Sequence, residues 1–160
     1  MSDFTIKPTT PEEARWIENF ITQQWGANII IAHGDTYYPH TLPGFLAMQN
    51  TRQVGLVTYH IHDMACEIVT LDSLQPGVGI GSALVTAVKN IAQQAGCTKL
   101  WLITTNDNLH ALGFYQKRGF ELARIHRHAV TQSRHLKPSI PLFGFENIPI
   151  RDEIELELPL

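Results

Sequence analysis

Apolar and polar residues alternate along this chain with two distinct periods, which predict where helices and strands lie. One apolar set recurs every three or four positions, as on one face of a helix, and comprises Ile80, Leu84, Val88, Ile91 and Ala95. Gly96 is a suitable C-terminal cap for this helix. The run from Glu67 to Leu71 is short, apolar and rich in β-branched residues, which predicts a strand just before the helix.

The amino-terminal part of the chain predicts a strand followed by a helix. Residues 4–6 begin as a strand. Thr10 and Pro11 then form a good helix start, with Thr10 as N-cap and Glu13 able to complete a capping box. The helix should end near Gly26. Its expected buried residues are Ile17, Phe20 and Ile21.

The rest of the chain predicts strands separated by turns and by two loops. The expected strands are residues 45–49, 54–62, 65–71, 100–104, 121–130 and 153–158. A short apolar run at 28–32 precedes a polar and aromatic loop at 34–43, and a long Pro-rich loop precedes the last strand. Alternation in that strand places one set of side chains inward: Ile154, Leu156 and Leu158. It places the other set outward: Glu153, Glu155 and Glu157.

Residues 75–82 have the glycine-rich sequence QPGVGIGS. They follow the strand that ends at Leu71 and lead into the helix that begins after Gly79. Glycine lets the backbone approach a ligand closely, and the free N–H groups of a first helical turn favour an anion. A strand, a glycine-rich turn and a helix therefore indicate a diphosphate site. The dinucleotide fingerprint would need glycine at Ser82, and a P-loop would need a Gly-Lys pair that the chain lacks, so neither class fits.

What remains resembles motif A of the GNAT N-acetyltransferase superfamily, Gln/Arg-x-x-Gly-x-Gly/Ala, with Gly79 and Gly81 as its glycines. The chain departs from it at Pro76, which occupies the Gln/Arg position and cannot donate a hydrogen bond. Residues 105–120 resemble motif B of the same superfamily, Asn-x-x-Ala-x-x-Phe-Tyr-x-Lys-x-Gly-Phe. The resemblance covers most of the chain and implies one domain, residues 1–160. Its implied fold is α+β, an α/β sandwich with a mixed, mostly antiparallel, V-splayed sheet flanked by helices.

The motif B residues also have local physical roles. Asn108 can cap a short helix, Gly119 can close it in the left-handed conformation, and Phe120 can make the accompanying apolar contact. Lys117 and Arg118 could approach phosphate groups, although a solvated helix end is the more common position for such a pair.

The resemblance further implies acetyl-CoA as co-substrate. The residues expected to contact it are Leu71, Ser73, Gly77, Val78, Gly79, Ile80, Gly81, Ser82, Asn108 and Tyr115. Leu71 is expected to act through its backbone N–H, as an oxyanion-hole donor to the thioester oxygen. Asn108 resembles the residue that contacts the pantetheine or pyrophosphate arm, in addition to capping its helix.

Two side chains are candidates for proton transfer. Tyr115 stands where the family places a tyrosine that protonates the leaving thiolate of CoA, and packing beside Phe114 is the alternative. Adjacent helix residues cannot both point to one face, so we expect Phe114 in the core and Tyr115 in the cleft. Glu67 stands where several GNAT enzymes place a catalytic glutamate, which would act as a general base. Its alternative is a half-exposed strand carboxylate, or one paired with a cation.

The histidines and cysteines favour neither a metal site nor a disulfide. His60 and His62, like His126 and His128, alternate on predicted strands and so should share a face. No well-spaced cysteine or carboxylate set accompanies them, so we expect no metal, and His126 could instead line an acceptor cleft. The two cysteines are expected to be buried thiols, which suits a reducing compartment.

Composition gives no support for nucleic-acid or membrane partners. The hydrophobic content of 44% is typical of a globular protein, and the formal net charge is only -3. The chain begins with a short polar segment and contains no long apolar run, so we expect no signal peptide and a cytoplasmic protein.

These observations favour an acetyl-CoA-dependent N-acetyltransferase, in which a primary amine of a small molecule or peptide attacks the thioester directly. A ping-pong route is disfavoured because neither cysteine lies in a recognisable nucleophile setting. The alternative is an acyl-CoA-binding sensor or interaction module of the same fold without turnover, which Pro76 keeps open. The glutamates of the last strand are either a solvated face or an acidic surface that attracts a cationic acceptor. The Pro-rich loop either shapes acceptor specificity or packs against a second subunit in a homodimer.

Overall fold

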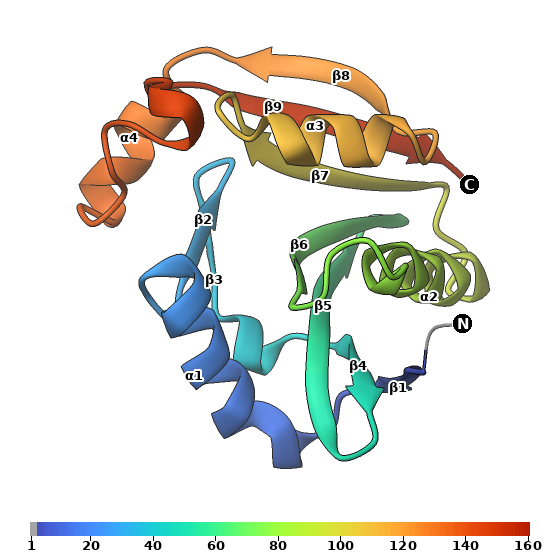
Figure 1. Ribbon diagram of the computed structural model, residues 1–160. Coiled ribbons are helices and arrows are strands. Elements are labelled where there is room, and N and C mark those ends of the chain that lie inside the picture. The colour runs from blue at the N-terminus through green and yellow to red at the C-terminus, as the bar shows by residue number, and fades with distance from the viewer. Residues whose placement is uncertain (1–2) are drawn as a thin grey trace.

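The structure of residues 3–160, a computed structural model, is built on a seven-stranded sheet with helices on both faces (Figure 1). Its strands lie in the spatial order β1 (Thr5–Pro8), β4 (Gly44–Gln49), β5 (Arg52–His62), β6 (Ala65–Ser73), β7 (Lys99–Thr105), β9 (Glu153–Pro159) and β8 (Glu121–His126). A separate hairpin pairs β2 (Ile30–Ala32) with β3 (Asp35–Tyr37). The helices are α1 (Ala14–Trp25), α2 (Ile80–Gln94), α3 (Leu109–Gln116) and α4 (Ala129–Leu136). Three short 3₁₀ turns are η1 (Pro11–Glu13), η2 (Pro39–Thr41) and η3 (Phe145–Asn147).

The sheet opens between its two parallel strands. β6 and β7 pair only over Ala65–Ile68 and Lys99–Leu102, whereas all other neighbouring strands are antiparallel. The register between β5 and β6 skips Val69, which is a bulge at the place where β6 leaves β7. In Figure 1, β1, β4, β5 and β6 form one arm of a V, and β7, β9 and β8 form the other. The predicted mixed, mostly antiparallel sheet flanked by helices is therefore confirmed.

Apolar residues fill both faces of the first arm because its strands alternate side chains between the faces. The helix face predicted from sequence packs on one of them, where α2 buries Ile80, Leu84 and Val88 against β5 and β6. The opposite face receives α1, whose buried residues are the three that were predicted: Ile17, Phe20 and Ile21. α3 contributes to the same core as α2, so both helices lie on one side of the sheet.

Several helix ends follow the predicted local chemistry. The Glu13 carboxylate accepts the backbone N–H of Thr10 at 2.6 Å, as in the expected capping box. Asn108 Oδ1 accepts the N–H of Ala111 at 3.1 Å and so caps α3. Gly119 follows α3 with a φ of 93°, a left-handed conformation that glycine adopts without strain.

Two predicted segments are different in the structure. The expected loop at 34–43 contains β3 and η2. The expected strand at 121–130 ends at His126, and α4 occupies part of the expected Pro-rich loop. His128 has a φ of 60°, and its N–H donates to Asp152 Oδ1 at 2.9 Å, so the chain turns there. His126 and His128 therefore do not share a strand face.

The two cysteines are free and buried, as expected. Burial raises the pKa of Cys66 to about 12, and Cys97 and Glu67 act in the same direction. A thiol with so high a pKa is a poor nucleophile. In residues 3–160, no helix is both long and apolar enough to cross a membrane.

Candidate active site

A cavity of about 830 Å³ lies beside the glycine-rich turn, between the end of β6, the start of α2 and one side of α3. Its walls include Gly77, Gly79 and Gly81 of the turn. Gly77 and Gly79 have φ values of 83° and 89°, which favour glycine, and Gly79 is the N-cap of α2. The unpaired N–H groups of this first turn can bind an anion.

Gly81 has a different reason to be glycine. A Cβ at position 81 would lie 3.0 Å from Cζ of Phe114, so the aromatic ring occupies the space of a side chain. Phe114 thereby packs α3 directly against the start of α2.

The structure gathers most of the residues expected to contact acetyl-CoA around this one cavity. Its walls include Leu71, Ser73, Gly77, Gly79, Ile80, Gly81, Ser82, Asn108 and Tyr115. Val78 does not line it, and its side chain is exposed. Leu71 and Ser73 lie on β6 beyond its pairing with β7, in the open part of the V.

Tyr115 directs an unpaired hydroxyl to the cavity. Among residues 3–160, His40 Nδ1 is the only fully buried side-chain nitrogen or oxygen without a hydrogen-bond partner. The Tyr115 hydroxyl has no hydrogen-bond partner in this range either, yet it is not among the fully buried atoms, so part of its surface is accessible. Tyr115 lines the cavity, and we therefore place the accessible hydroxyl there. Burial, with the nearby charge of Asp72, raises the pKa of Tyr115, although Arg118 opposes this, and the hydroxyl stays protonated.

The expected division between Phe114 in the core and Tyr115 in the cleft is wrong in part. Both rings line the cavity, and Tyr115 is the more deeply buried of the two. Tyr115 meets Phe114 and Phe120 edge to face, with ring centroids 5.1 and 5.2 Å apart. Gly81 and Arg118 lie against Phe114, so this ring serves the cavity wall as well as the core.

Asp72 is a further ionisable residue of the cavity that sequence reasoning missed. Burial raises its pKa from 3.8 to about 6, although a hydrogen bond from the Trp25 indole, 3.1 Å away, works in the opposite direction. A single aspartate at the end of a strand carries no sequence signal for this environment.

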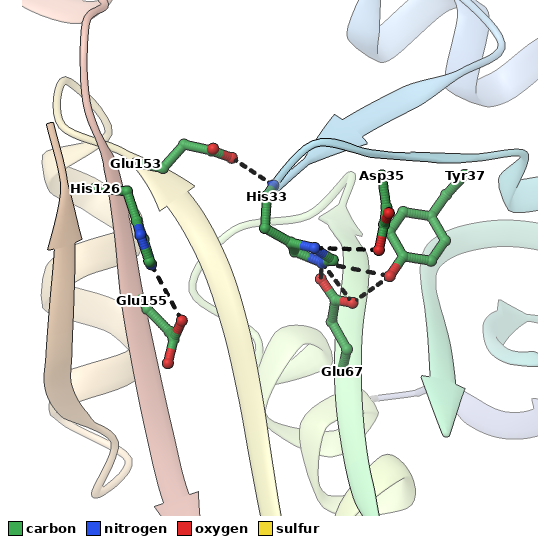
Figure 2. Close-up of polar contacts among 7 residues, drawn as sticks. All are labelled: His33, Asp35, Tyr37, Glu67, His126, Glu153 and Glu155. Carbon is green, nitrogen blue, oxygen red and sulfur yellow. Dashed lines mark hydrogen bonds and ion pairs between the residues drawn. The ribbon is translucent and has the colours of Figure 1, made fainter. Parts of the chain in front are cut away.

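Glu67 lies in a second cavity, of about 390 Å³, on the face of the sheet opposite α2. The side chain of Glu67 is only 2% exposed. Tyr37 donates its hydroxyl to Glu67 Oε1 at 2.6 Å, and His33 Nε2 lies 2.9 Å from Oε2 (Figure 2). The alternative of a half-exposed carboxylate is therefore wrong, and Glu67 has a histidine partner.

His33 lies between the carboxylates of two elements. Its Nδ1 is 3.3 Å from Asp35 Oδ2, while its Nε2 contacts Glu67. Burial lowers the pKa of His33, but the hydrogen bond to Glu67 and the charges of Glu67, Asp35 and Glu153 outweigh it, so the pKa lies above its ordinary value. The neighbouring carboxylates thus stabilise the charged form of the imidazole relative to that of a free histidine.

The glutamate face of β9 is not simply solvated. Glu153 is only 3% exposed, because the hairpin lies over it and the backbone N–H of His33 donates to Glu153 Oε2 at 3.1 Å (Figure 2). Glu155 contacts His126 Nε2 at 3.2 Å and lines the Glu67 cavity. A third cavity, of about 510 Å³, lies on the other side of His33 and includes Glu153 and His126. The predicted inward set of β9 does pack toward the core, with Leu156 fully buried.

The histidines form no metal cluster in the described part of the chain. His60 and His62 share a face as predicted, with rings stacked 6.3 Å apart beside the Glu67 cavity. Across residues 3–160, no group of three or more His, Cys, Asp or Glu side chains is arranged to hold a metal ion.

Sequence reasoning missed the hairpin that carries His33, Asp35 and Tyr37. A signal was present in the sequence, because the His33-Gly34 pair lies between two short strand-like runs. In the structure both residues have positive φ, of 44° and 83°. A two-residue turn with both φ values positive is typical of tight hairpins. The pairing of His33 with Glu67 had no such signal.

Comparison with known proteins gives a consistent result. Residues 8–120 match the model of the Acetyltransferase (GNAT) family. Two uncharacterized proteins of Bacillus subtilis strain 168 are similar: YxbD is 40% identical over 94% of this chain and 96% of its own length, and YdhI is 38% identical over 93% and 94%.

Solved structures share the fold. An IAA acetyltransferase from Bacillus cereus ATCC 14579 is 20% identical, with a TM-score of 0.75 over 98% of this chain and 99% of that one. A GNAT family acetyltransferase from Elizabethkingia anophelis, crystallised with acetyl-CoA bound, is 20% identical, with a TM-score of 0.72 over the whole of both chains.

Proposed function

Because this chain belongs to the GNAT acetyltransferase family, we propose that it moves the acetyl group of acetyl-CoA to a primary amine of a small molecule or peptide. The observation that carries the proposal is the unpaired hydroxyl of Tyr115 in the same cavity as the glycine-rich turn. A pyrophosphate at the start of α2 would leave the pantetheine arm to extend along the open edge of β6 toward Leu71 and Tyr115. The similar fold that was crystallised with acetyl-CoA supports this choice of ligand.

The proposed reaction is direct attack of the amine on the thioester. The amine nitrogen forms a bond to the carbonyl carbon, and the carbonyl oxygen gains negative charge that the Leu71 N–H would stabilise. The C–S bond then breaks, and the Tyr115 hydroxyl supplies the proton that the thiolate of CoA takes up. An ammonium acceptor first loses one proton to Glu67, directly or through water, so that its nitrogen can attack. The second proton, which the nitrogen loses as the intermediate collapses, restores the Tyr115 hydroxyl.

The environment of Glu67 supports an ammonium acceptor. Three carboxylates line its cavity, those of Asp35, Glu67 and Glu155, together with the cations of Lys99 and Arg124. Trp101 adds an aromatic wall 5.0 Å from His33 between ring centroids. Glu155 belongs to β9, so the glutamate face of this strand offers the acceptor a carboxylate with which an ammonium can pair.

The second candidate function is a sensor that binds acyl-CoA without turnover. Two observations favour it: Pro76 offers no donor to a pyrophosphate, and Gln75 is engaged with Gln49, with Nε2 and Oε1 2.9 Å apart. A sensor would bind acetyl-CoA and leave it intact in the presence of amines.

The test is thiol release from acetyl-CoA by purified protein against polyamines, amino acids, aminoglycosides and short peptides, with calorimetric titration of acetyl-CoA in parallel. We expect release with one amine class, and a loss of about a hundredfold in Glu67→Gln, the size expected for a general base. Binding without release over the whole panel would favour the sensor. Absence of acetyl-CoA binding would overturn both functions.

A further inference from the structure

The glycine-rich turn has no cation of its own. Residues 74–83 include no lysine, arginine or histidine, and the first cationic residue of α2 is Lys89, more than two turns into the helix. Gln75 has its amide turned to Gln49 of β4, and Pro76 has neither a side-chain donor nor an N–H. A CoA pyrophosphate carries negative charge that backbone N–H groups alone would have to balance.

Arg118 brings a cation to this turn from the end of α3. Its Nε and Nη2 donate to the hydroxyl of Ser82, at 2.9 and 2.6 Å, and Ser82 belongs to the first turn of α2. Both residues line the cavity beside the turn. Arg118 is thus linked to the anion-binding end of α2 although the two residues are 36 positions apart.

The guanidinium is held in place before any ligand arrives. Its Cζ lies 3.5 Å from the centroid of the Phe114 ring, and Nη1 donates to the carbonyl of Phe114 at 2.8 Å. The same ring packs on Gly81, so the turn, the aromatic ring and the cation form one stack. A side chain that is already fixed loses less entropy when it binds.

Arg118 keeps donors for a ligand. A guanidinium has five N–H groups. The bonds to Ser82 and Phe114 use three of them, so two lack a partner among residues 3–160. Lys117 also lines the cavity, but of these two cations Arg118 is the one that is hydrogen-bonded to the first turn of α2.

We propose that Arg118 binds the pyrophosphate of CoA and supplies the positive charge that the glycine-rich turn lacks. This inference rests on the proposed binding of acetyl-CoA. It makes Arg118 a determinant of cofactor affinity that acts from the opposite side of the cavity, in place of a donor at position 76.

The experiment is calorimetric titration of the wild type, Arg118→Ala and Lys117→Ala with three probes: CoA, dephospho-CoA, which lacks only the 3′-phosphate, and pantetheine, which lacks every phosphate. We expect Arg118→Ala to weaken both CoA and dephospho-CoA about tenfold to thirtyfold, the size of a lost charge-assisted contact. Pantetheine should bind the variant and the wild type equally. Lys117→Ala removes the same charge one residue away and should change CoA affinity by less than about threefold.

Three results would contradict the inference in different ways. Equal CoA affinity of Arg118→Ala and the wild type would remove Arg118 from cofactor binding. A loss with CoA but none with dephospho-CoA would place the contact at the 3′-phosphate and overturn the pyrophosphate assignment. A wild type that fails to bind CoA would overturn the proposed function itself. If Arg118→Ala unfolds, Arg118→Gln keeps donors to Ser82 without the charge and should show the same selective loss.

Discussion

His33 Nε2 lies 2.9 Å from a carboxylate oxygen of Glu67, although the two residues are 34 positions apart in the chain (Figure 2). The backbone N–H of the same histidine donates to Glu153 on β9. One residue therefore connects both arms of the V, because Glu67 belongs to β6 and Glu153 to the other arm. This arrangement fixes the hairpin beside the cavity in which we place the acceptor amine.

Replacing His33 should destabilise the protein in a pH-dependent way. The pKa of His33 is raised in the folded state, so its contribution to stability is fully present below the ordinary pKa of 6.5 and is lost as the pH rises through the folded value. We expect His33→Gln to lower the free energy of unfolding by about 1 to 2 kcal/mol near pH 6 and by less near pH 9.5. Urea unfolding at the two pH values measures the difference.

His62 provides the matched control for this prediction. Its side chain is 76% exposed and its partner Asp63 is 88% exposed, so His62→Gln should change stability little at either pH. Equal losses for His33→Gln at both pH values would mean that the imidazole contributes by packing and not by its charge.

Tyr115→Phe should separate chemistry from binding. The hydroxyl has no hydrogen-bond partner within residues 3–160, so its removal should hardly change folding stability or acetyl-CoA affinity. If the hydroxyl protonates the thiolate, kcat should fall by about a hundredfold or more. Thiol release under conditions where chemistry limits turnover measures kcat, and calorimetry measures affinity. Unchanged turnover would remove Tyr115 from the mechanism.

Asp72→Asn should stabilise the protein at high pH. Burial raises the pKa of Asp72 to about 6, so the folded state holds this proton more tightly than the unfolded chain does. Below the ordinary pKa of 3.8 the carboxyl is protonated in both states, and burial of its charge costs the wild type nothing. As the pH rises from 3.8 toward 6 and above, this cost appears and the free energy of unfolding of the wild type falls. At about pH 8, the variant should exceed the wild type by about 1 to 3 kcal/mol in free energy of unfolding.

The gain from Asp72→Asn should shrink as the pH falls from 6 toward 4, since the wild-type carboxyl is then protonated in the folded state. Denaturant unfolding across this range tests it. A loss of stability of the same size at every pH would show that the Trp25 hydrogen bond outweighs the burial of charge.

Two glycine substitutions should change stability in opposite directions. Gly77 has a φ of 83°, so Gly77→Ala should cost about 1 to 2 kcal/mol in backbone strain. Gly113 lies inside α3 with an ordinary φ, and a methyl group added to its Cα would meet no atom within 4 Å beyond the adjacent residues and the backbone of its own helix, so Gly113→Ala should gain about 0.5 to 1 kcal/mol. Thermal unfolding compares the two variants. A neutral Gly77→Ala would mean that the turn tolerates another conformation.

Local features of the sequence determined much of this fold. The apolar spacing after Ile80 predicted α2, and Asn108 and Gly119 predicted the ends of α3, because helix periods and caps depend on residues only a few positions apart. The same local motifs identified the family and named most of the residues around the large cavity. These features could be recognised directly because each is complete within one short segment.

The tertiary structure alone decided which distant side chains meet. Nothing near His33 in the sequence indicates Glu67, and nothing near Arg118 indicates Ser82. Glu153 looked like a solvent-facing residue of an alternating strand, and it is buried because a hairpin from the other end of the chain covers it. Such contacts depend on how the two arms of the sheet and the hairpin pack, and short-range periodicity carries no information about that packing.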